Sequence, residues 1–197
     1  GTACLQAHSL DPASATAELL GSYQFSDDKR PDGLYLVEDE TTASRTVVTL
    51  AGENSFWGWF TIWGWSEGET TLEFLDASNP AAIHATQKLV LDGALVASRR
   101  VQDTLYVVTR YTPGIENYLP YALDEKAKDA NQELLEQTTL EQLLPQIRDV
   151  GTTVRPLVDS ANCYLPASAV DNNRNPSIIT ITSISLTSQQ AVASTCF

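Results

Sequence analysis

Two stretches of this chain nearly repeat each other: Asp32–Val37 has the sequence DGLYLV, and Asp103–Val108 has DTLYVV, 71 residues later. A second motif recurs at a similar spacing. SLDPA at Ser9–Ala13 returns as ASNPA at Ala77–Ala81, with the prolines 68 residues apart. A third, partial copy begins near Ile179. Motifs that recur in the same order at nearly the same spacing indicate repeated units, each burying its faces against its neighbours.

The repeated units are predicted to be antiparallel β-sheets. Runs rich in β-branched and aromatic residues, typical of strands, lie at 34–37, 46–50, 71–75, 105–109 and 178–184. Turn residues such as Asp92-Gly93 separate these runs. No helical pattern lies between successive strands before residue 122, which argues against parallel βαβ units.

A tryptophan-rich stretch also predicts stacked sheets. In an extended strand, alternate residues share a face, so one face of this stretch carries Trp57, Trp59, Trp63 and Trp65. The opposite face carries Phe56, Phe60 and Ile62. A strand that is apolar on both faces needs cover on both, and stacked blades provide it. The alternative is that the four indoles are exposed and stack on sugar rings, as in a carbohydrate-binding or carbohydrate-active module.

A helical insertion is expected near residues 124–148. Asp124–Glu136 combines strong helix formers with helical spacing. Thr138 followed by Glu141 resembles a capping box for a second short helix, which Pro145 would end. We expect the first helix to pack on the sheets through an apolar stripe formed by Ala130, Leu134 and Leu135.

The chain is therefore predicted to be a mainly β protein with two to three propeller-like blades that form an incomplete ring. We treat residues 1–197 as one propeller fragment. Its expected blade-like units are about 1–70, 71–121 and 150–197, with the helical insertion at 122–149.

Several of these motifs resemble a known family. Leu72–Pro80 has the sequence LEFLDASNP, and Ala97–Thr109 has ASRRVQDTLYVVT. Together with Leu144-Pro145 and NCYLP at Asn162–Pro166, they resemble secreted bacterial and archaeal proteins with a C-terminal β-propeller domain distantly related to WD repeats. The resemblance implies a secreted, periplasmic or cell-surface protein and supplies no catalytic residues. Closing a propeller takes roughly four to eight blades, so the open blade faces of this chain favour self-association.

Charge and hydropathy narrow the range of partners. Twelve basic against 25 acidic residues give a net charge of −13, which disfavours nucleic acid as a partner. No apolar run is long enough for a transmembrane helix. The expected ligand is a protein or a carbohydrate.

The three cysteines leave alternatives open. Cys163 and Cys196 either form a disulfide or remain as buried free thiols. Thr2-Ala3-Cys4 resembles the end of a bacterial lipobox, in which the cysteine carries a lipid, and a common apolar triplet is the alternative. The chain carries no signal peptide, so we expect any leader to lie outside it.

No catalytic apparatus is visible in the sequence. A hydrolase would require His8 or His84 beside a carboxylate in a pocket, and the chain has no Gly-x-Ser-x-Gly motif. No cofactor is expected, and Asp171–Asn175 is a weak calcium candidate because it lacks the order of a calcium loop. We expect a non-enzymatic extracytoplasmic binding or scaffold protein. It would recognise its partner through loops at one end of the blades or through the helical insertion.

Overall fold

Three antiparallel sheets make up the computed structural model, which describes residues 3–25, 30–39, 41–52, 68–119, 121–149, 154–164 and 177–197. The N-terminal hairpin pairs β1 (Cys4–Asp11) with β2 (Thr16–Gln24). The first sheet has six strands in the order β10-β9-β6-β5-β4-β3. Its strands are β3 (Gly33–Asp39), β4 (Ser44–Gly52), β5 (Glu69–Asp76), β6 (His84–Asp92), β9 (Gln146–Asp149) and β10 (Val154–Pro156).

The second sheet has four strands in the order β12-β11-β8-β7. They are β7 (Ala94–Val101), β8 (Thr104–Tyr111), β11 (Ile178–Ser185) and β12 (Gln190–Cys196). The helices are α1 (Glu125–Gln137) and α2 (Leu140–Leu143), with short 3₁₀ turns η2 (Pro80–Ala82) and η3 (Ser160–Asn162). Sheets of this kind confirm the predicted mainly β, antiparallel, blade-like fold.

A glycine carries the chain from the first sheet to the second. Gly93 has a φ of +106°, which side chains of L-residues rarely adopt, and a Cβ there would lie 3.1 Å from the backbone of Arg110. The Thr70 hydroxyl donates a 2.8 Å hydrogen bond to the Gly93 carbonyl and holds this crossing in place.

The main core lies between the two sheets. Alternate residues of β5 and β8 point into it, so that Leu72 and Phe74 lie in one cluster with Leu105 and Val107. All four side chains are fully buried. Ile184 of β11 joins the same cluster, which therefore spans both sheets.

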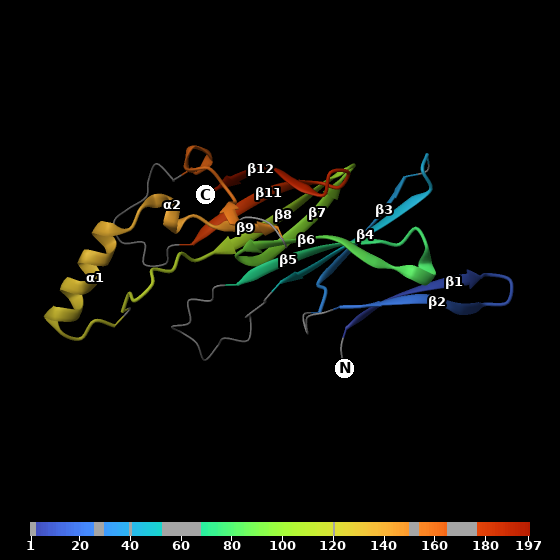
Figure 1. The fold of residues 1–197 in the computed structure, drawn as a ribbon, viewed down its shortest axis with the longest axis horizontal. Helices are drawn as coiled ribbons and strands as arrows, with labels where there is room; N and C mark the ends of the chain where they lie inside the picture. The colour runs from blue at the N-terminus through green and yellow to red at the C-terminus, as the bar shows by residue number, and fades with distance from the viewer. Residues whose placement is uncertain are drawn as a thin grey trace.

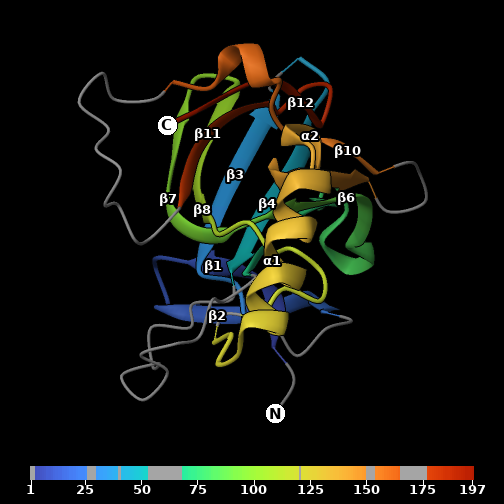
Figure 2. The same ribbon diagram turned by 90° about the vertical axis from the view of Figure 1, so that its left-hand side faces the viewer.

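The opposite face of the first sheet is covered by the N-terminal hairpin. Phe25, Val47 and Leu75 form a second cluster there, and the Tyr23 hydroxyl donates a 2.8 Å hydrogen bond to Glu73. Gly21 allows close approach, because a Cβ would lie 2.0 Å from the Pro80 carbonyl oxygen. Figure 2 shows the resulting layers, with β1 and β2 on one side of β3 and β4, and the second sheet on the other. The hairpin thus covers this face around β4 and β5, while Leu34 and Leu36 of β3 on the same face remain exposed.

Three of the hairpins use the same turn. Asp11, Asp39 and Ser185 each accept hydrogen bonds from groups two or three residues further on. The fourth residue after each has a positive φ, namely Ala15 (54°), Ala43 (52°) and Gln189 (56°). In Figure 1 these turns lie toward one end of the molecule, and α1 lies at the other.

The sheets do not follow the expected units. Residues 71–121 contain β5 and β6 of the first sheet together with β7 and β8 of the second. The sequence repeat and the sheets are out of step because the chain changes sheet at Gly93, inside that unit.

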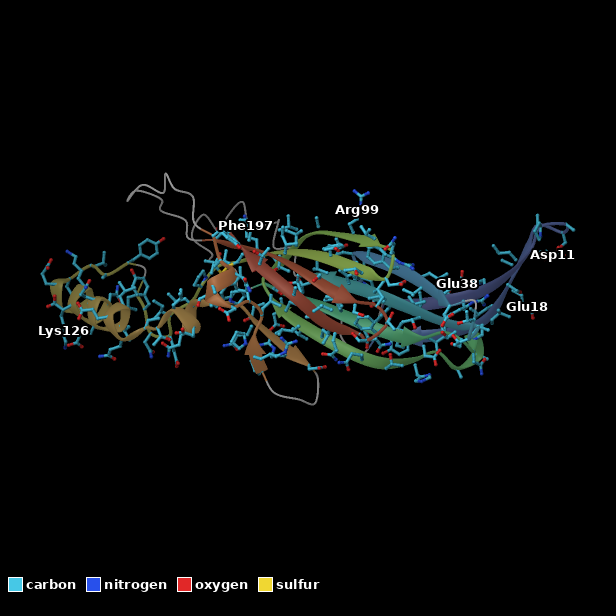
Figure 3. The ribbon with its side chains drawn as sticks, turned by 90° about the horizontal axis from the view of Figure 1, so that it is seen from above. Asp11, Glu18, Glu38, Arg99, Lys126 and Phe197 are labelled. Carbon is cyan, nitrogen blue, oxygen red and sulfur yellow. A yellow bond between two sulfur atoms is a disulfide. The ribbon has the colours of Figure 1, made fainter. Side chains whose placement is uncertain are left out.

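The helical insertion exists, with two differences from the expectation. The capping box of α2 uses Thr139 and Gln142 in place of Thr138 and Glu141. The apolar stripe of α1 does not pack on the sheets: Ala130 is exposed, Leu134 is half-buried and Leu135 is 47% exposed. The packing prediction was wrong because α1 is anchored by a polar contact and projects beyond the ends of the strands (Figures 1 and 3).

Candidate functional site

The insertion between β8 and β11 connects the outer edges of both sheets. Its strand β9 pairs with β6, with Ile147 opposite Leu91. Asp149, the last residue of β9, accepts hydrogen bonds from Gln87 of the first sheet and from Gln190 of the second, the latter at 3.4 Å. On the same strand, Arg148 forms an ion pair with Glu69 and lies 3.5 Å from Asp92. The insertion is therefore held to the first sheet by the pairing of β9 with β6 and by the contacts of Arg148 and Asp149, and to the second sheet by Asp149.

A disulfide attaches the end of the insertion to β12. Cys163 and Cys196 are bonded, with their Cα atoms 4.4 Å apart, and Cys196 is buried beside Leu144 and Val158. The Tyr164 N–H donates a 2.8 Å hydrogen bond to the Cys196 carbonyl. These cysteines are the pair for which the sequence left a bridge or free thiols open. Cys4 is exposed and unpaired.

The segment that contains α1 and α2, described at residues 118–119 and 121–143, projects beyond the strands and is called the arm. Asp124 caps α1 by accepting a 2.7 Å hydrogen bond from the Ala127 N–H. Asn131, the buried residue of α1, holds the preceding segment with two bonds, since its Oδ1 accepts from the Leu119 N–H and its Nδ2 donates to the Leu119 carbonyl. The sequence signal that could have indicated this contact is the polar residue Asn131, one helical turn before Leu134 of the expected apolar stripe.

The arm presents apolar side chains to solvent. Leu123 is 94% exposed, and the other exposed large apolar residues of the arm are Tyr118, Leu119, Tyr121, Leu135 and Leu140. Figure 3 places Lys126 of the arm at the far end of the molecule from Asp11. Exposed apolar groups gathered on a projecting element are typical of protein interaction sites.

A small groove lies at the base of the insertion. It has a volume of about 240 Å³ and is lined by residues 155–159, Asn162 and residues 191–194 of β12. Its size is below the range of roughly 300–1,000 Å³ for small-molecule sites. The groove is therefore better suited to a side chain of a partner than to a cofactor.

A comparison with known families identifies the fold. A family model described as a β-propeller domain matches residues 6–197. The chain belongs to this β-propeller family. No curated protein and no solved structure matches this propeller chain.

The two histidines of the propeller chain occupy exposed positions away from the insertion. His8 Nε2 contacts Gln6 Oε1 at 3.3 Å, and His84 Nδ1 lies 3.1 Å from the Ala82 carbonyl. His84 is opposite Asp76 in the β5–β6 register, which brings the residues of a Ser-His-Asp set close together at Asp76, Ser78 and His84.

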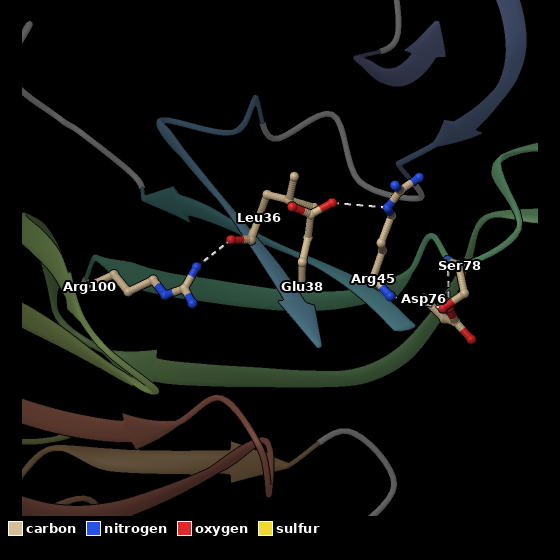
Figure 4. Close-up of polar contacts among 6 residues, drawn as sticks. All are labelled: Leu36, Glu38, Arg45, Asp76, Ser78 and Arg100. Carbon is tan, nitrogen blue, oxygen red and sulfur yellow. Dashed lines mark hydrogen bonds and ion pairs between the residues drawn. The ribbon is translucent and has the colours of Figure 1, made fainter. Parts of the chain in front are cut away.

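Asp76 and Ser78 of this set instead stabilise the turn that follows β5. The Ser78 hydroxyl and N–H both bond Asp76 and hold the pKa of its carboxyl below the usual range, and the hydroxyl also accepts from the Arg45 N–H at 3.0 Å (Figure 4). In a triad the serine hydroxyl would donate to the histidine. The arrangement supports the structural role of Ser78 in this hairpin.

Two predicted sites fall outside the described residues of the propeller chain. They are the tryptophan face (Trp57, Trp59, Trp63 and Trp65) and the calcium candidate Asp171–Asn175, and both remain predictions. Within the described ranges, no group of three or more metal-ligating side chains occurs. None of the helices in the described part of the chain has the length and apolar character needed to span a membrane.

Proposed function

We propose that this chain is a non-enzymatic extracytoplasmic binding or scaffold domain and forms part of a larger β-propeller. The observation that carries the proposal is the arm, which projects beyond the ends of the strands and presents Leu123 and its neighbours to solvent. A rigid sheet scaffold that positions an exposed recognition element is a common arrangement in binding proteins.

The disulfide supports an extracytoplasmic location. A structural disulfide persists in oxidising compartments and is rare in the cytosol. The Cys163–Cys196 bridge closes the insertion onto β12, so the same bond that indicates the compartment also fixes the base of the arm.

Thiol trapping in the native organism tests the compartment. Cells are quenched in acid and treated with an alkylating reagent before and after reduction, and the peptides that contain Cys163 and Cys196 are quantified. We expect both cysteines to be alkylated only after reduction and to fractionate with exported proteins. Alkylation of both thiols without reduction, in a cytosolic fraction, would contradict the proposal.

Site-specific photo-crosslinking tests the binding role of the arm. A photoreactive residue is placed at Leu123, and a control at Leu10, which is also exposed but lies on β1 at the other end of the molecule. We expect one discrete adduct from the arm position and none from the control. Equal, diffuse labelling at both positions would reject the arm as the recognition element.

A further inference from the structure

We propose that the groove beside β12 binds an extended peptide segment of a partner protein, which adds to the open edge of this strand and places one carboxylate against Arg155. The proposal gives the binding domain proposed above a second recognition surface, and it does not depend on the arm. The open edge of β12, the shape of the groove beside it and the charge of Arg155 each support it.

The open edge of β12 carries unused backbone groups. β12 is the last strand of the second sheet, so one of its edges faces away from β11. Ile179 and Phe197 exchange two backbone hydrogen bonds, at 3.0 and 2.9 Å. Because such pairs alternate along an antiparallel ladder, the N–H and carbonyl groups of Cys196 and Ser194 point away from β11. The Cys196 carbonyl accepts from the Tyr164 N–H, whereas no described residue bonds the outward groups of Ser194.

The chain already pairs with this edge at one point. Cys163 forms a parallel bridge with Cys196, beside the disulfide that joins the same two residues. The Thr195 hydroxyl donates a 2.8 Å hydrogen bond to the Asn162 carbonyl, which ends the turn η3. Because η3 is a 3₁₀ turn and not an extended segment, the pairing does not continue toward Ser194. A peptide segment placed there would continue a strand position that the chain itself begins.

The groove lies along this continuation of the edge. Residues 191–194 of β12 line one side of it, and residues 155–159 with Asn162 line the other. Among the latter, Leu157 and Val158 are buried. A bulge in the β11–β12 register leaves Val192 without a counterpart on β11, and its side chain is 68% exposed. An added strand would meet backbone donors and acceptors together with apolar side chains, which is the pattern of recognition by strand addition.

Arg155 gives the groove its charge preference. Its side chain is exposed, and it forms no ion pair within the described part of the chain. Asp159, which also lines the groove, accepts a 2.8 Å hydrogen bond from the Ala161 N–H as the cap of η3. A guanidinium binds a carboxylate through paired hydrogen bonds. Because the net charge of the chain is −13, a run of acidic residues would be repelled, so we expect one carboxylate in an otherwise uncharged segment.

Peptide selection tests the proposal. A phage-displayed library of random linear peptides is depleted on the Ser194→Pro chain and then panned on the unsubstituted chain. Proline removes the N–H that faces the open edge and takes no bond from the β11–β12 ladder, so this variant should fold. The depletion also removes peptides that bind the arm, because both proteins carry it. Enriched peptides are synthesised, and their dissociation constants are measured by fluorescence anisotropy.

We expect the enriched peptides to carry one acidic residue among β-branched residues. They should bind Ser194→Pro at least about tenfold more weakly, because a carbonyl of the bound peptide loses its donor. Arg155→Gln should weaken them several-fold, and it should not affect peptides in which glutamine replaces the acidic residue. Arg99→Gln is the control, since it removes the same charge from an exposed position on β7. Should Ser194→Pro fail to fold, Arg155→Gln serves for the depletion and decides the test.

Three outcomes would overturn the proposal. The first is that no peptide is enriched after depletion, and the second is that enriched peptides bind Ser194→Pro and Arg155→Gln as tightly as the unsubstituted chain. The third is a concentration-dependent dimer, seen by analytical ultracentrifugation and abolished by Ser194→Pro, which would identify a second copy as the occupant. None of these outcomes alters the thiol-trapping result or the crosslinks from Leu123, so failure here is distinguishable from failure of the binding role.

Discussion

The Tyr35 and Ser98 hydroxyls lie 2.8 Å apart and connect the edge strand of the first sheet to the edge strand of the second. The two residues are 63 positions apart in the chain, so this bond forms only when the sheets stack. It therefore reports directly on the packing that defines the fold.

Removing one partner of this bond should destabilise the stacked sheets. We expect Tyr35→Phe to lower the free energy of unfolding by about 1 kcal/mol, the usual net value of such a bond. The matched control is Tyr106→Phe, whose ring is exposed in this chain, and it should change stability little. Urea unfolding measures both variants, and an equal loss in the two would contradict the assigned role of Tyr35.

The disulfide is expected to make a large contribution to stability. Cys163 and Cys196 are 33 residues apart, and closing a loop of that length is worth about 3–4 kcal/mol in the chain-entropy model. The double variant Cys163→Ser/Cys196→Ser should lower the unfolding temperature accordingly. Cys4→Ser is the control, because Cys4 is exposed and unbonded, and it should leave the melting curve unchanged.

Two buried threonines should tolerate loss of their hydroxyls. Thr109 and Thr180 lie opposite each other on β8 and β11, and neither hydroxyl has a hydrogen-bond partner among the described residues. Replacing either by valine, a residue of similar shape, removes an unsatisfied polar group, so stability should stay the same or rise.

Thr70→Val is the matched control for these variants. Its buried hydroxyl donates to the Gly93 carbonyl, and the substitution leaves that carbonyl without this partner, so we expect a loss of about 1 kcal/mol. Chemical denaturation of Thr109→Val, Thr180→Val and Thr70→Val measures the free energy of unfolding of each variant. A loss in Thr109→Val as large as that in Thr70→Val would show that the Thr109 hydroxyl is bonded.

The β3–β4 turn should be sensitive to acid. Hydrogen bonds from Thr41 and then Thr42 lower the pKa of Asp39 from 3.8 to about 2. A lowered pKa means that the turn is stabilised by the carboxylate above its ordinary pKa and that this contribution is lost as the pH falls from 3.8 toward 2. Asp39→Asn should remove this part of the pH dependence. The test measures the free energy of unfolding of the unsubstituted chain and of Asp39→Asn between pH 3.8 and about 2, together with an NMR titration of the Asp39 carboxyl. An equal dependence of the unfolding free energy on pH in the two proteins would contradict the prediction.

The arm should loosen when its polar anchor is removed. Asn131→Ala leaves both the N–H and the carbonyl of Leu119 without their side-chain partner. We expect faster amide hydrogen exchange in residues 118–137 and unchanged exchange in β4 and β5. Gln132→Ala is the control, since the Gln132 side chain donates to Glu136 within α1 itself. Faster exchange in β4 and β5, with unchanged exchange in the arm, would be inconsistent with a local anchor.

Much of the fold follows from local pattern. The run at 105–109 was predicted as a strand and forms most of β8, with Leu105 and Val107 on its buried face and Tyr106 on the other. The position of the helices near residues 124–148 follows from helix formers and capping residues. The pairing of Cys163 with Cys196 was one of two alternatives that spacing allowed.

The sequence by itself determined the strands β3, β4, β5, β8 and β11 and the helical insertion, because each depends on residues only a few positions apart. Only the tertiary structure decided how Gly93 divides the strands between two sheets, how β9 reaches β6 and why α1 projects as an arm. These features depend on contacts between residues far apart in the chain. Their free energies, such as that of Tyr35 with Ser98, exist only once the sheets have packed.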